Sequence, residues 1–139
     1  MNLEIFERLI MAVVISGLGV AGYILFNRFT LKRAESKIAR FSSYRSGIPA
    51  LVYFTTPTCA PCKTVQRPTI ERIKDNFGRW FQVIEVDAST QPELAQEWGV
   101  MSVPTTFVID ATGTPRYVNH GVTNAETLIK QLELEDYSI

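Results

Sequence analysis

The sequence has no excess of charge of either sign, and this shortage excludes one large class of protein. Lysine and arginine together number 14, as do aspartate and glutamate, so the formal net charge of the 139 residues is zero. Proteins that bind nucleic acid usually carry a positive excess that neutralises phosphates, so no nucleic-acid partner is expected. The 46% hydrophobic content is too high for a disordered chain, and the length predicts one folded domain.

Residues that bind metals are equally scarce. The chain has two cysteines, Cys59 and Cys62, and one histidine, His120. A structural zinc ion needs four ligands, usually cysteine and histidine, so one chain cannot assemble such a site and a second molecule would have to contribute. We therefore expect neither a metal nor another cofactor.

Charge is missing altogether from one long stretch near the N-terminus. The 19 residues from Leu9 to Asn27 contain no charged side chain. A helix of that length spans about 28 Å, which matches the hydrocarbon core of a membrane. The alternative is a cleaved signal peptide, which would start with a positive region, whereas the residues before this stretch are mostly acidic. A retained transmembrane anchor is therefore predicted over residues 1–27.

A basic segment follows the predicted span. Residues 27–48 carry six basic side chains against Glu35, whereas only Arg8 precedes the span. Because positive residues beside a span stay on the cytoplasmic side, the rest of the chain is predicted to be cytoplasmic; the alternative is an extracytoplasmic domain. Apolar residues recur every three or four positions, so residues 28–48 are predicted to form a basic amphipathic helix and linker that can rest on anionic lipid.

Gly47 and Pro49 end this pattern, and a folded domain is predicted over residues 49–139. Its strands are expected at 50–55, 80–86, 105–110 and 116–119, and its helices at about 60–78, 90–98 and 123–132. Two of these helices begin with the spacing of a capping box, Thr90–Glu93 and Thr123–Glu126. Helices that alternate with strands and end in a hairpin indicate an α/β fold with a mixed sheet.

The two cysteines lie in Cys59-Ala-Pro-Cys62, between a predicted strand and a predicted helix. At the first turn of a helix, the sulfur of Cys59 faces unpaired N–H groups and the positive end of the helix dipole, which favour the thiolate. Cys62 lies one turn later, within disulfide distance, and can resolve a mixed disulfide by attacking Cys59. The pattern predicts a redox pair. A purely structural disulfide is the alternative, but it would close a very short loop and stabilise little.

From Leu51 onward the sequence resembles the thioredoxin family. Phe54–Lys63, FTTPTCAPCK, is similar to the strand, active-site loop and helix start of that family, and Val103-Pro104-Thr105 resembles its cis-proline motif. The resemblance implies a thioredoxin-like fold and disulfide exchange with protein disulfides or dithiols, supplied by an upstream thiol reductant. It also implies two catalytic cysteines and five substrate-binding residues, namely Cys59 and Cys62, and Pro61, Val103, Pro104, Thr105 and Gly121.

The sequence departs from simple thioredoxins around the cysteines. Thr58 stands where the family has a tryptophan, Tyr53 stands where it has a buried acid, and Val83 is expected at the place of the lysine that partners this acid. Proton transfer from the resolving thiol must then use water or another group, such as Glu85 if it points inward. The helix proline, Pro68, comes one residue later than usual.

The first strand of the family is expected to be absent, because too few residues separate the predicted span from Leu51. A helix over residues 28–45 is expected to take the place of the N-terminal part of the fold. Two functions follow. The first is a membrane-anchored thiol-disulfide oxidoreductase. The alternative, favoured by the missing tryptophan and acid, is an accessory subunit or assembly factor of a membrane protein complex that uses a thioredoxin-like domain for docking.

Overall fold

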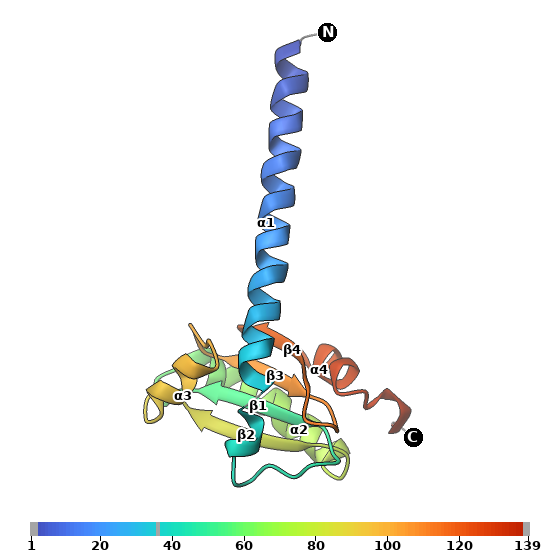
Figure 1. Ribbon diagram of the computed structural model, residues 1–139. Helices are drawn as coiled ribbons and strands as arrows, with labels where there is room; N and C mark the ends of the chain where they lie inside the picture. Colours follow the sequence, from blue (N-terminus) through green and yellow to red (C-terminus); the bar gives the residue numbers. More distant parts are fainter. Residues whose placement is uncertain (1–2, 36, 138–139) are drawn as a thin grey trace.

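The computed structural model describes residues 3–35 and 37–137. A long helix, α1 (Leu3–Glu35), leads into an α/β domain (Figure 1). α1 runs without a break across residues 27 and 28, so the predicted span and the start of the basic segment form one helix. A short 3-10 helix follows at Ile38–Arg40. The predicted amphipathic helix thus stops well before residue 45, because Ala34 and Ile38 are already buried on the sheet and the chain must turn back to enter the first strand.

The apolar part of α1 lies outside the domain. Every side chain from Leu3 to Phe26 is exposed, and the most apolar part of the helix has a mean hydropathy of 2.4. By length and composition, this helix is apolar enough to cross a membrane. Its C-terminal end behaves differently, because Thr30 and Ala34 are buried against the domain.

Four strands form one mixed sheet. They are β1 (Ala50–Thr55), β2 (Gln82–Asp87), β3 (Thr105–Ile109) and β4 (Pro115–His120), in the order β2-β1-β3-β4. β1 runs parallel to β2 and antiparallel to β3, and β3 and β4 form a hairpin. No strand precedes β1 among residues 3–35 and 37–49, as the sequence predicts, so β2 lies at an edge of the sheet.

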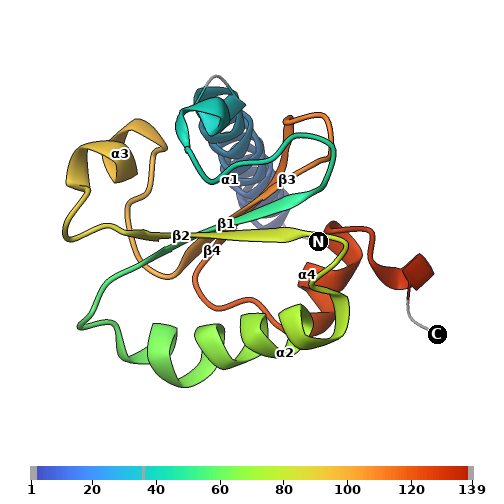
Figure 2. The same ribbon diagram turned by 90° about the horizontal axis from the view of Figure 1, so that it is seen from below.

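Helices cover both faces of this sheet (Figure 2). On one face α2 (Arg67–Phe77) and α4 (Ala125–Gln131) pack against Leu51 and Tyr53 of β1. On the other face α3 (Pro92–Glu97) and the end of α1 cover Val52 and Phe54, around the buried side chain of Trp98. β1 is buried on both sides, which explains its continuous apolar sequence. The end of α1 therefore supplies cover for the α3 face of the sheet.

Both predicted capping boxes are wrong, each by a short shift. Thr90 donates its hydroxyl hydrogen to the carbonyl of Asp87, and α3 begins instead at Pro92, a residue that suits the first position of a helix. At α4 the cap is Asn124, whose side chain accepts the amide hydrogen of the third helical residue. Asn124 is an equally good capping residue, and the amide of Thr123 is already bonded to a side chain from the neighbouring helix.

Candidate active site

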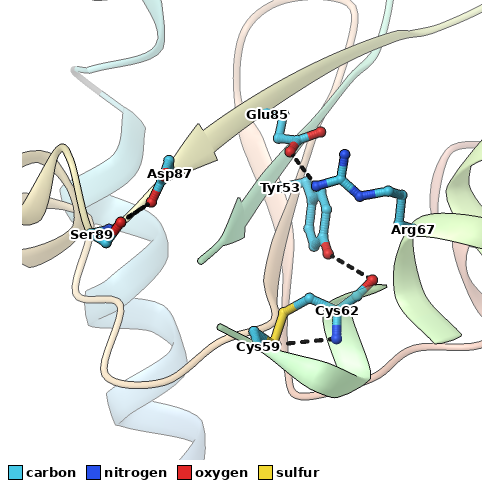
Figure 3. A network of polar contacts seen from close by, with 7 residues as sticks. All are labelled: Tyr53, Cys59, Cys62, Arg67, Glu85, Asp87 and Ser89. Carbon is cyan, nitrogen blue, oxygen red and sulfur yellow. Dashed lines mark hydrogen bonds and ion pairs between the residues drawn. A yellow bond between two sulfur atoms is a disulfide. The ribbon is translucent and has the colours of Figure 1, made fainter. Parts of the chain in front are cut away.

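Cys59 and Cys62 form a disulfide where the chain passes from β1 into the helix that continues as α2 (Figure 3). Their Cα atoms are 5.3 Å apart. Cys59 directly precedes the first helical residue, and its Sγ accepts a hydrogen bond from the backbone N–H of Cys62 at 3.2 Å. An N–H aimed at this sulfur stabilises negative charge on it after reduction, so the geometry favours Cys59 as the thiolate.

The two sulfur-bearing residues differ in accessibility. Cys59 retains 7% of its surface and Cys62 none, so Cys59 is the more exposed residue, as predicted. The sulfur of a partner protein can approach Cys59 but not Cys62. Pro61, between them, is exposed and has helical backbone angles, which suit the first turn.

The late position of Pro68 has a structural counterpart. Residues Cys62–Gln66 form a π-helical segment, and the amide of Arg67 bonds to the carbonyl of Cys62, five residues back. A π turn holds one residue more than an α turn, so it absorbs the extra residue between Cys62 and Pro68. The expected kink is therefore a change of hydrogen-bond pattern just before this proline, which has no N–H to donate.

Tyr53 lies beneath the cysteine pair in place of the buried acid of the family. Its side chain is 1% exposed, and its phenol donates a hydrogen bond to the carbonyl of Cys62 at 3.3 Å. Burial raises the pKa of Tyr53 above the ordinary value of 10. The phenol is therefore neutral at physiological pH and cannot accept a proton from the Cys62 thiol.

The residue beside Tyr53 on β2 is Glu85. The sheet register pairs Tyr53 with Glu85 and Leu51 with Val83, so the expectation that Val83 lies next to the acid position is wrong. Glu85 does not point inward either. Its side chain is 43% exposed and forms an ion pair of 2.6 Å with Arg67 (Figure 3). Among the residues that the structure describes, no carboxylate is hydrogen-bonded to either cysteine, which leaves water as the acceptor.

The predicted substrate residues come together beside the disulfide. The Val103–Pro104 peptide bond is cis, as expected, and the carbonyl of Pro104 accepts the amide hydrogen of Gly121 at 2.8 Å. Gly121 has a φ of +88°, a conformation that favours glycine. Val103 packs against the cluster that contains both cysteines, and Thr105 is fully buried at the start of β3.

Sequence reasoning missed Gln66. This side chain is fully buried, and it both accepts the amide hydrogen of Thr123 at 2.7 Å and donates to the carbonyl of the same residue at 3.2 Å. The two bonds tie the active-site helix to the segment that follows Gly121. The only signal in the sequence was a polar residue within a helix, which is usually solvent-exposed.

Within the described part of the chain there is no group of three or more histidine, cysteine or acidic side chains that could hold a metal ion. The pair at Cys59 and Cys62 therefore offers thiol chemistry alone, in which two sulfur atoms store and release two electrons.

Comparisons with known proteins agree with this chemistry. A family model described as Thioredoxin matches residues 34–134. The chain is 29% identical over 102 residues to a thioredoxin-like protein of the cyanobacterium Synechocystis sp., covering 72% of this chain and 95% of that protein. It is 33% identical over 69 residues to a thioredoxin of Bacillus subtilis, covering 50% and 65%.

A solved structure has the same fold. It is thioredoxin-2, described as a component of the protein secretion machinery of the malaria parasite. The two chains superpose with a TM-score of 0.60 at 20% identity, covering 66% of this chain and 87% of the other.

Proposed function

This chain belongs to the thioredoxin family, and from that premise we propose that it is a membrane-anchored thiol-disulfide oxidoreductase acting on partner proteins. One observation carries the proposal: the cysteine pair sits at a helix start with one accessible sulfur, that of Cys59, beside the cis-proline loop. We assign the anchor to residues 1–27, the basic segment to 28–48 and the thioredoxin-like domain to 49–139.

The proposed exchange transfers two electrons and two protons. In the reduced protein the Cys59 thiolate attacks one sulfur of a partner disulfide, and the other partner sulfur leaves as a thiolate that takes a proton from water. Cys62 loses its proton to water and attacks the Cys59 sulfur, which breaks the mixed disulfide and releases the second partner thiol. The products are a partner dithiol and the Cys59–Cys62 disulfide of this structure. A protein dithiol upstream reduces that disulfide again.

We assign substrate positioning to the residues around the disulfide. Val103, Pro104 and Thr105 form the strand-like edge along which an extended partner segment lies, and Gly121 leaves open space beside it, because nothing lies within 4 Å of its missing side chain. Pro61 presents the surface between the cysteines. No charged residue is in this set, which fits recognition through the partner's backbone.

The membrane anchor determines which proteins are available as partners. The exposed apolar helix supports an anchor, and the six basic residues after the span support a cytoplasmic domain with residues 1–8 outside. In a cytoplasmic position, where thiols are kept reduced, the pair would act as a reductant. The basic segment would also contact anionic lipid.

The substitution at Tyr53 favours a second function. Without an acid near Cys62, the release step depends on water, and slow release suits an accessory subunit of a membrane complex that uses the domain for docking.

Thiol trapping in native membranes separates the two functions. For the oxidoreductase, Cys62→Ser should accumulate mixed disulfides with several proteins because the resolving thiol is missing, and the matched variant Cys59→Ser should accumulate none. A single stoichiometric partner retained equally by both variants would instead identify a docking subunit.

A further inference from the structure

A groove separates α1 from the loop that leads to the cis-proline. One wall is the C-terminal part of α1, and the other is formed by residues 99–103 together with α3. The groove has a volume of about 550 Å³, and Arg33 is the one charged side chain among its described lining residues. Even this charge lies against an aromatic ring, since its guanidinium is 4.3 Å from the ring centre of Phe29. The groove therefore suits an apolar ligand.

The groove extends to the redox site. Two of its lining residues, Thr56 and Val103, also border the disulfide. The carbonyl of Thr56 accepts the amide hydrogen of Cys59 at 3.2 Å, and Val103 packs against the cluster that holds Cys59 and Cys62. A chain segment bound in the groove thus has one end next to the accessible sulfur.

The groove also reaches the level of the predicted membrane surface. Its first lining residue along α1 is Phe26, the last residue but one of the uncharged stretch, and Arg33 lies about 10 Å farther along the helix axis. The ring of Phe26 lies 5.8 Å from that of His120, the residue before Gly121 of the substrate site. Figure 1 shows α1 leaving the domain where β4 ends.

Exposed apolar side chains surround this entrance. Met101 is 82% exposed, and Phe29 and Val122 are about half exposed. An apolar surface of this kind beside a binding site usually marks a contact with a protein or a membrane. Here it is continuous with the predicted transmembrane helix, so a partner that comes out of the same bilayer can contact both.

We propose that this groove binds an apolar juxtamembrane segment of a membrane-embedded partner protein and brings a cysteine of that segment to Cys59. The proposal rests on the proposed function and names its substrate class, proteins whose exchanging cysteines lie at the bilayer surface. A lipid chain would also fit an apolar groove, but it has no sulfur to use the disulfide at the groove's end. The exchange itself proceeds as described above, with the partner disulfide as the electron acceptor.

The test uses the full-length reduced protein in phosphatidylcholine vesicles and three synthetic peptides that share one disulfide loop. The first peptide carries the loop directly after an apolar span, the second carries it after the same span and a flexible Gly/Ser linker, and the third has no span. Single-turnover loss of the peptide disulfide is measured. We expect the first peptide to react faster than the second, although both are equally concentrated in the membrane.

A groove variant and a matched control make the result specific. Met101→Asp places a charge at the entrance of the groove and should lower the ratio of the first rate to the second by about tenfold, the scale set by one lost apolar contact and a buried charge. Tyr117→Asp changes a similarly apolar, half-exposed side chain outside the groove and should leave the ratio unchanged.

The possible failures are distinguishable. No exchange with the peptide that lacks a span would overturn the proposed function, and this inference with it. Exchange with that peptide but equal rates for the two membrane peptides would overturn the inference alone, as would an unchanged ratio in Met101→Asp. A photoreactive side chain at Gln96, which lines the groove, should crosslink to the first peptide. Crosslinks to lipid alone would show a lipid site instead.

Discussion

Tyr53 donates a hydrogen bond from its phenol to the backbone carbonyl of Cys62, 3.3 Å away. This carbonyl also accepts the amide hydrogen of Arg67 in the π turn. The tyrosine therefore supports the backbone of the resolving cysteine instead of exchanging protons with its thiol. In the family this position holds an acid, so the change affects the release step more than the first attack.

Replacing Tyr53 by aspartate should accelerate release. A carboxylate below Cys62 can accept the thiol proton, which the neutral phenol cannot, and general-base catalysis of this kind contributes about a hundredfold. The measurement is the decay rate of a preformed mixed disulfide between Cys59 and a small thiol. Tyr53→Phe is the control and should not accelerate the decay. Equal decay rates in the aspartate variant and the wild type would show that the acid position does not limit release.

Cys59 should be the first cysteine to react with iodoacetamide. In the reduced protein its sulfur receives the N–H of Cys62 and is the more exposed, whereas Cys62 is fully buried. We expect labelling of Cys59 to persist below pH 8, where an ordinary thiol with a pKa of about 8.5 is mostly protonated. Peptide mapping after brief labelling at several pH values gives the order. Earlier labelling of Cys62 would reverse the assigned roles.

Asp110 should stabilise the β3–β4 turn in a pH-dependent way. Burial alone would raise its pKa, but hydrogen bonds from Thr112, Thr114 and Arg116 hold that pKa at about 2, below the ordinary 3.8. Because the folded-state pKa is lowered, the stabilisation is complete above pH 3.8 and is lost as the pH falls toward 2.

The substitution Asp110→Asn should therefore lower the free energy of unfolding by about 1 to 2 kcal/mol at pH 7. The difference from the wild type should shrink below pH 3.8. Urea unfolding of the detergent-solubilised protein measures it, and Asp75→Asn, at an exposed position of α2, serves as the control. A difference that stays constant between pH 7 and 2 would contradict the assignment to this carboxylate.

Gly99 should be needed where α1 contacts the domain. Its φ is +72°, and a side chain added there would meet Thr30 of α1 at 3.5 Å, an ordinary contact distance. The cost of Gly99→Ala therefore comes from the left-handed backbone and should be about 1 kcal/mol of unfolding free energy. Gly22→Ala, at a helical position with open space, should be neutral in the same unfolding measurement.

The domain should face the cytoplasm. A membrane-impermeant maleimide applied to intact cells after mild reduction should leave Cys59 unlabelled, and lysis should expose it, because the basic residues after the span keep that side inside. Labelling without lysis would place the domain outside and make envelope or secreted proteins its partners.

The sequence by itself determined the features that depend on local chemistry and spacing. Two cysteines three residues apart can form the disulfide wherever the chain turns from a strand into a helix, and the uncharged stretch predicts a membrane-length helix from its length alone. The cis-proline motif and Gly121 were located by their resemblance to a family. The positions of the helix caps were less certain, since neighbouring polar residues compete for them.

Only the tertiary structure decided which distant residues meet. The pairing of Tyr53 with Glu85 depends on the register of two strands, and a shift of two residues would leave the same alternation of buried and exposed side chains while changing the neighbour. The bonds of Gln66 to Thr123 and the contact of Phe26 with His120 likewise join residues far apart in the chain. They exist because the helices pack on both faces of one sheet, which brings the end of the predicted membrane helix to the active site.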